Sequence, residues 1–164
     1  MDAEEIESGF VRVAAGQQWL SGAGQPAAED GEWAYFSSSA RPFLTRLDLG
    51  ARMCVVAEKL LVAPKRSKVR GRLLRIVPFS FRNAIRTYEL EGGWAVMATA
   101  SRVRRICLAE GGTLTVAPTA LVAYLGRRPT GFCPRLRLRD LFLPRVPRLR
   151  LHFHGPATVW VEGA

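Results

Sequence analysis

The chain of 164 residues has few residues of the kinds that catalytic and metal-binding motifs most often need. It contains three cysteines and two histidines. The cysteines, Cys54, Cys107 and Cys133, are far apart and form no CxxC pair. Neither a disulfide framework nor a structural zinc site is therefore supported, and we expect buried or unreactive thiols.

Long apolar segments are missing as well. No apolar run approaches the roughly 20 residues that a helix needs to cross a bilayer. The first ten residues, MDAEEIESGF, are acidic, unlike a secretory signal or an Arg-rich transit peptide. We therefore expect a soluble, cytoplasmic protein without a membrane span, in which residues 1–8 form an acidic tail.

Lysine is scarce, although the chain is strongly basic. The formal net charge is +10, with 21 Arg and only 3 Lys. Residues 1–50 hold three Arg against eight acidic residues, a net of −5, whereas residues 51–164 hold 21 Lys or Arg against six, a net of +15. Arg binds phosphate and carboxylate through paired hydrogen bonds, so an acidic protein or a nucleic acid is a candidate partner. A GC-rich genome also produces Arg-rich chains, and both explanations stay open.

The sequence contains an internal repeat. Three pairs of segments match in the same order at offsets of 59 to 61: GEWAYFSSSAR (31–41) with GGWAVMATASR (92–102), RLDL (46–49) with RICL (105–108), and VAEKLLVA (56–63) with VAPTALVA (116–123). The repeats therefore span about 31–63 and 92–124. Trp33 and Trp94 occupy equivalent positions, which favours packing in a core or interface over stacking on a ligand.

The repeated units are typical of β-strands. Short segments rich in β-branched or aromatic residues and bounded by Gly or Pro occur at 43–49, 102–108, 113–116 and 120–124. The best helical candidates, 81–86 and 139–143, are only about one turn long. Because one such unit cannot bury its apolar face alone, it packs on its sibling. We predict a single all-β domain over 1–164, an antiparallel β-sandwich or flattened barrel of duplicated strand units around one shared core, with a closing pair of strands at about 148–162.

The residues also resemble a known family. The G-x-W-A pattern, LTVAPTALVAYL (114–125) and FHGPATVWVEG (153–163) resemble the altered-inheritance-of-mitochondria family. The resemblance covers roughly residues 50–164. It implies a fold similar to the tryptophan RNA-binding attenuation protein, with small repeated β-sheets that assemble into oligomers, and it transfers no catalytic residue. We therefore expect a homo-oligomer.

Two segments alternate charged and apolar residues. Successive side chains of a strand face opposite sides, so RLRLR (135–139) and RLRLHFH (148–154) each place their basic residues on one side. Side by side, these strands would form a basic face able to hold phosphates, which makes a nucleic-acid-binding module the second hypothesis. The candidate residues are Arg135, Arg137, Arg139, Arg148 and Arg150. The same alternation also arises where one face of a sheet is merely solvated.

His152 and His154 raise the question of a metal site. An H-x-H pair on a strand, followed by a carboxylate such as Glu162, resembles half of a cupin site, but metal binding needs at least a third ligand and the chain has no other histidine. Both are therefore weak metal candidates, no cofactor is expected, and a cupin-like metalloprotein is the third hypothesis. Nucleophile and phosphate-loop motifs are missing, so we predict a non-catalytic β-repeat protein that binds partners or assembles with itself, and not an enzyme.

Overall fold

The computed structural model describes residues 6–7, 10–14, 18–22, 28–29, 31–65, 70–75, 84–132 and 149–163. The first strands are β1 (Ile6–Glu7), β2 (Phe10–Ala14), β3 (Trp19–Leu20), β4 (Ala28–Glu29), β5 (Trp33–Ser37), β6 (Phe43–Asp48), β7 (Met53–Val56), β8 (Leu60–Pro64) and β9 (Arg70–Arg75). The others are β10 (Ala84–Leu90), β11 (Trp94–Thr99), β12 (Val103–Leu108), β13 (Thr113–Val116), β14 (Leu121–Gly126), β15 (Thr130–Phe132), β16 (Arg150–His154) and β17 (Ala157–Glu162). Two 3-10 turns, η1 (Ala57–Lys59) and η2 (Pro118–Ala120), interrupt them.

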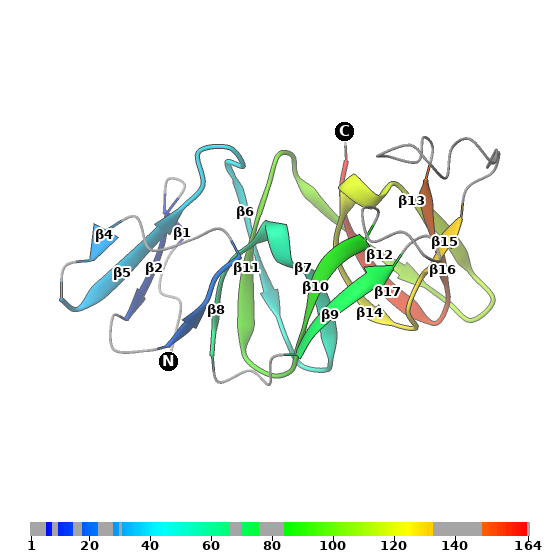
Figure 1. Cartoon of the computed structure of the whole chain (residues 1–164), viewed down its shortest axis with the longest axis horizontal. Helices are drawn as coiled ribbons and strands as arrows, with labels where there is room; N and C mark the ends of the chain where they lie inside the picture. The colour runs from blue at the N-terminus through cyan, green and yellow to red at the C-terminus, as the bar shows by residue number, and fades with distance from the viewer. Residues whose placement is uncertain are drawn as a thin grey trace.

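The predicted all-β fold is confirmed, and the strand pairs are antiparallel. The first sheet has the order β1-β2-β5-β4, the second β3-β8-β11-β6, the third β12-β17-β14-β7-β10-β9, and the fourth β13-β16-β15. Figure 1 shows them in this order along the longest axis of the molecule. No helix long and apolar enough to cross a membrane occurs in the described part of the chain.

Three apolar cores separate the four sheets. The first core joins β2 and β5 to β8 and β11, and the second joins β6, β8 and β11 to β7, β10 and β14. The third joins β7, β14 and β17 to β13 and β16. The inner strands β8 and β11 therefore bury side chains on both faces, and their segments LLVA and WAVMA are continuously apolar. The outer strands β2 and β16 bury alternate residues only, because one of their faces is solvated. A single shared core was expected, whereas the described residues form three.

The same order of elements occurs twice along the chain. Residues 33–90 hold β5, β6, β7, η1, β8, β9 and β10, and residues 94–154 hold β11, β12, β13, η2, β14, β15 and β16. Strand pairing follows the same scheme, because β10 lies between β7 and β9 just as β16 lies between β13 and β15. The repeated order of elements therefore extends past the predicted repeats 31–63 and 92–124. The duplication itself stays a prediction.

Several local expectations need correction. The closing strands β16 and β17 do not pair with each other, because β16 joins the fourth sheet and β17 the third. Residues 84–86, expected in a short helix, begin strand β10, and the helical candidate 139–143 lies outside the described residues. Of the expected acidic tail, residues 6–7 form β1. Cys107 is exposed and Cys54 half-buried, whereas Cys133 lies outside the described part.

Candidate functional site

Most of the predicted Arg-rich face lies outside the described residues, namely Arg135, Arg137, Arg139 and Arg148. Strand β16 carries the rest. Arg150 and His154 are exposed and His152 is half-buried, whereas Leu151 and Phe153 are buried in the third core. The predicted alternation is therefore present in β16. Whether this face binds anions stays a prediction.

Threonines from both neighbouring strands complete this surface. In the register of the fourth sheet, Thr113 lies opposite His154, and Thr115 and Thr130 lie opposite His152 on its two sides. Oγ1 of Thr115 is 3.0 Å from Nδ1 of His152, and the two imidazole rings pack edge to face with centroids 4.5 Å apart. We call this surface the histidine face. It consists of Thr113, Thr115, Thr130, Arg150, His152 and His154.

Glu162 does not complete a metal site with the two histidines. It ends β17 in the third sheet, opposite Val103, and its carboxylate is bound to Lys59 and to the backbone of Ala100. Within the described ranges, no group of three or more His, Cys, Asp or Glu side chains is placed to hold a metal ion. The third ligand suggested from the sequence is therefore wrong, because β16 and β17 enter different sheets.

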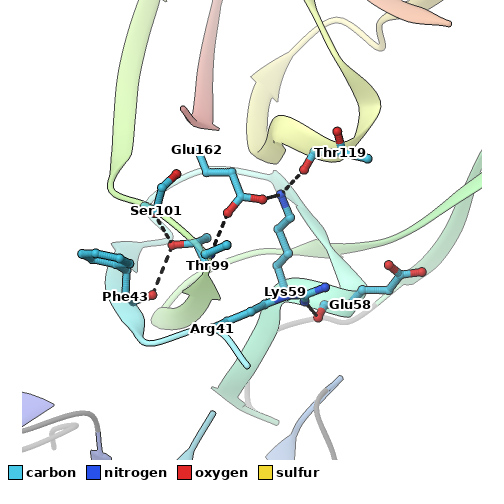
Figure 2. Close-up of polar contacts among 9 residues, drawn as sticks. Arg41, Phe43, Glu58, Lys59, Thr99, Ser101, Thr119 and Glu162 are labelled. Atoms are coloured by element: carbon cyan, nitrogen blue, oxygen red, sulfur yellow. Dashed lines mark hydrogen bonds and ion pairs between the residues drawn. The ribbon is translucent and has the colours of Figure 1, made fainter. Parts of the chain in front are cut away.

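The most deeply buried charged contact in the described structure is one that the sequence interpretation missed. Lys59 lies on η1 with 5% of its surface exposed. Its Nζ donates to the carbonyl oxygen of Thr119 at 2.5 Å and to Oε1 of Glu162, while Oε2 of Glu162 accepts from the backbone N–H of Ala100 at 2.9 Å. Figure 2 shows the amine between the glutamate carboxylate and the Thr119 carbonyl. We call Lys59, Ala100, Thr119 and Glu162 the lysine junction.

Further polar contacts surround the junction. The hydroxyl of Thr99 lies 3.2 Å from the carbonyl oxygen of Phe43 and 2.8 Å from that of Ser101. Nη1 of Arg41 donates to the carbonyl oxygen of Glu58, next to Lys59 (Figure 2). The junction thus ties the two 3-10 turns to the end of β17 and to the turn between β11 and β12. The charged and polar groups of the junction bind one another, so we interpret it as a contact that holds these segments together.

One signal in the sequence points to this junction. Lys59 stands in VAEKLLVA, where every other residue except Glu58 is apolar, and its counterpart in VAPTALVA is Thr119. A lysine in the middle of an otherwise buried segment is rarely solvated, and it needs a partner. The partner itself could not be found this way, because Glu162 is 103 residues away along the chain.

The electrostatics of Lys59 follow from its burial. Burial lowers its pKa from the usual 10.5, while the hydrogen bond and the charge of Glu162 act in the opposite direction. The unfolded chain therefore retains the Lys59 proton to a higher pH than the folded chain. Stability increases with pH wherever the unfolded state binds more protons. The charged form of Lys59 thus costs stability, and this cost is removed as pH rises toward 10.5.

This sign gives a first prediction. Between pH 8 and about pH 10, we expect the free energy of unfolding of the wild type to rise relative to that of Lys59→Met, which has no amine to titrate. The comparison with the variant cancels the other basic groups, which titrate in both proteins. Urea unfolding of the two proteins at matched pH values measures the difference. A difference that falls with pH would contradict the assigned direction of the pKa shift.

A small polar pocket lies elsewhere, lined by Arg52, Arg70, Glu89 and Glu91. Arg52 is 3.8 Å from a carboxylate oxygen of Glu89 and 3.5 Å from one of Glu91. The pocket lining therefore holds two positive and two negative side chains, and Arg52 lies near both glutamates. We assign the pocket no chemistry.

Comparison with known proteins supports the fold alone. No family model matches the chain, and no curated protein sequence matches it. The fold is similar to the X-ray crystal structure of protein SPYM3_0169 from Streptococcus pyogenes, with a TM-score of 0.58 and 13% identity. The match covers 96% of this chain and 84% of the other.

Proposed function

We propose that this chain is a non-catalytic β-repeat assembly protein that self-associates by pairing strand β6 with β6 of a second copy. One observation carries the proposal. Strand β6 ends the second sheet and exposes Phe43, 42% of whose surface is accessible. An edge strand presents backbone N–H and C=O groups that can pair with another strand. A twofold pairing of β6 would join two copies into one continuous sheet and close the assembly as a dimer.

The charges of β6 favour this pairing. In an antiparallel pairing centred on Leu47, Arg46 of each copy lies opposite Asp48 of the other copy. The dimer therefore contains two such pairs of opposite charge. Asp48 is largely exposed, and one of its carboxylate oxygens lies 3.3 Å from Nε of Arg46 in the same chain. The Arg46 guanidinium also lies 5.8 Å from the centre of the Trp94 ring. Opposite charges directly across two strands contribute about 0.2–1 kcal/mol per pair.

The counterpart of β6 in the second unit is a poorer candidate. Strand β12 also ends its sheet, but it exposes Arg104 and Arg105 at adjacent positions. Adjacent side chains point to opposite faces, so both faces of this edge carry positive charge. Charged side chains on an edge strand protect it from pairing. We therefore assign the pairing edge to β6 of the first unit, whereas the equivalent strand β12 of the second unit is protected from pairing.

Two further points support the proposal. The resemblance to the altered-inheritance-of-mitochondria family implies repeated β-sheets that assemble into oligomers. Lys59 is buried and Glu162 half-buried, and they are bound to each other and to backbone groups, which fits a structural role better than a catalytic one. The proposed function is accordingly self-assembly without catalysis.

A charge swap tests the pairing. We expect a dimer for the wild type by light scattering after size exclusion and by sedimentation equilibrium. Arg46→Asp and Asp48→Arg each place like charges opposite one another, and each should weaken the dimer about 10-fold, whereas the double variant Arg46→Asp/Asp48→Arg should restore it. Arg104→Asp on β12 is the matched control and should leave the dimer intact. A wild type that stays monomeric, or a double variant no tighter than the single ones, overturns the proposal.

A further inference from the structure

Two equivalent strand pairs differ on one face. In the first unit β7 pairs with β10, and Met53 and Val55 lie opposite Leu90 and Tyr88. In the second unit β13 pairs with β16 in the same register, and Thr113 and Thr115 lie opposite His154 and His152. Each residue of β13 stands 60 positions after its counterpart in β7, as in the repeat VAEKLLVA and VAPTALVA.

The difference follows from what covers each face. Met53, Val55 and Leu90 are buried in the second core, and Tyr88 packs against it. The corresponding face of the second unit is the histidine face, which is largely exposed. Its back is apolar, because Leu151 and Phe153 lie in the third core. The fourth sheet therefore has one solvated face, where the chain has histidine and threonine in place of apolar residues.

This face is unlike an ordinary solvated surface. Solvated faces usually mix charges of both signs. Strands β13, β15 and β16 contain no acidic residue, and β16 places Arg150, His152 and His154 in one row at intervals of about 6.8 Å. Threonines flank the row on both neighbouring strands, whose backbones lie about 4.8 Å away. A row of basic groups flanked by neutral donors is suited to an extended anion.

We propose that the histidine face binds the phosphate groups of an extended anionic ligand, and that protonation of His152 and His154 strengthens the binding. Arg and protonated His form charge-assisted hydrogen bonds with phosphate oxygens, and the threonine hydroxyls add neutral ones. The backbone of a single-stranded nucleic acid presents such phosphates in a line, and free phosphate presents them singly. This site lies apart from β6, so it is independent of the proposed self-association.

The contact between His152 and Thr115 explains the effect of protonation. In a neutral imidazole one ring nitrogen donates and the other accepts, whereas both donate in the protonated ring. Nδ1 of protonated His152 then donates to Oγ1 of Thr115, 3.0 Å away, and the hydroxyl proton of Thr115 is free to point at a phosphate. The two imidazole rings are 4.5 Å apart, so their positive charges repel until an anion lies across them.

Among the described residues, few charged side chains lie near this pair. On its own strand the pair is preceded by Arg150, and the strands on either side contribute threonines to this face. Along the chain, the next charged residues are Glu110 before β13, Arg127 and Arg128 before β15, and, outside the described residues, Arg135 after β15 and Arg148 before β16. Histidine side chains change charge between about pH 5 and pH 8. The chain has no other histidine, so a change in binding over this interval can be assigned to the pair by substitution.

The test measures binding of a fluorescein-labelled single-stranded oligouridylate by anisotropy at pH 5.5 and pH 7.5. EDTA and constant salt are present, since EDTA keeps metal-bridged binding out of the measurement. We expect binding at pH 5.5 to be at least about 10-fold tighter than at pH 7.5, because protonation adds one or more charge-assisted hydrogen bonds. The double variant His152→Gln/His154→Gln should remove the pH effect, and Thr115→Val should reduce it without changing the shape of the side chain. Circular dichroism confirms that each variant is folded at both pH values.

A matched arginine control separates this site from the overall positive charge. Arg150→Gln should weaken binding at both pH values, whereas Arg86→Gln should not, although Arg86 is exposed at the equivalent position of β10. Competition with inorganic phosphate and with unlabelled oligouridylate distinguishes a single-phosphate site from a strand-binding site, and displacement by either supports the proposal. Binding that is the same at both pH values, or a pH effect that survives the double histidine variant, overturns it.

Discussion

Glu162→Gln is expected to lower the free energy of unfolding by about 3 kcal/mol at pH 7, near the lower end of the range for breaking a buried ion pair. The variant leaves the charged amine of Lys59 buried without its counter-ion, and Lys59 is only 5% exposed. The value lies near the lower end because the carbonyl of glutamine can still accept one hydrogen bond from the amine. Urea unfolding followed by tryptophan fluorescence measures the loss.

The loss should be asymmetric between the two partners. Lys59→Met leaves a carboxylate that is 15% exposed in its side chain and still accepts from Ala100, so its cost should be clearly smaller. Replacing both partners with neutral groups of similar volume is often close to neutral, so Lys59→Met/Glu162→Gln should recover most of the stability lost in Glu162→Gln. The double-mutant cycle gives the coupling between the two side chains directly.

Two controls define what would contradict this assignment. Glu58→Gln removes the same charge from an exposed neighbour of Lys59 and should change stability by less than about 0.5 kcal/mol. Raising the pH toward 10.5 should reduce the loss in Glu162→Gln, because the buried amine gives up its proton more readily. Equal losses for Glu58→Gln and Glu162→Gln at pH 7 would show that the junction does not stabilise the fold.

The strands were predictable from local patterns, because those patterns act over a few residues. TLTV at 113–116 coincides with β13, and the alternation of β16 correctly separates its buried leucine and phenylalanine from its exposed arginine and histidine. The unbroken apolar run of β11 also carried a readable signal, since a strand buried on both faces does not alternate. That signal indicates more than two layers of sheet, which the expected sandwich did not include.

The arrangement of the sheets was not predictable in the same way. Strands β16 and β17 are joined by a short turn at 155–156, yet they enter different sheets, and nothing in the local alternation records that change. The partner of Lys59 depends on the same change, because Glu162 reaches the amine only from the end of β17 in the third sheet. Contacts between residues more than a hundred positions apart follow from topology, and topology follows from packing across all four sheets.

Gly22→Ala is expected to destabilise the protein by about 2–3 kcal/mol, the upper part of the roughly 1–3 kcal/mol that an added group costs in a close-packed site. A Cβ at this position would lie 1.8 Å from the carbonyl oxygen of Ala57 and 2.9 Å from its carbonyl carbon. Both atoms are backbone of η1, so the collision cannot be relieved by rotating a side chain. The N–H of Gly22 also donates to the carbonyl oxygen of Leu60 at 3.0 Å, and this bond must lengthen when the segments separate. Urea unfolding measures the effect.

Gly50→Ala is the matched control. A Cβ at Gly50 would meet nothing within 4 Å, so the substitution should be neutral or stabilise by up to about 1 kcal/mol through the unfolded chain. An equal loss in both variants would show that backbone freedom, and not the contact with η1, is what the glycine at position 22 provides.

The same collision should reach the lysine junction. Lys59 ends η1, two residues after the carbonyl that a Cβ at position 22 would strike, so moving η1 displaces the amine from Glu162 and Thr119. Gly22→Ala and Glu162→Gln should therefore be non-additive: once the amine has moved, removing its counter-ion costs less, and the coupling should exceed about 0.5 kcal/mol. Simple additivity would mean that η1 yields at Ala57 without moving Lys59. In that case Gly22 and Glu162, at the end of β17, would stabilise η1 independently of each other.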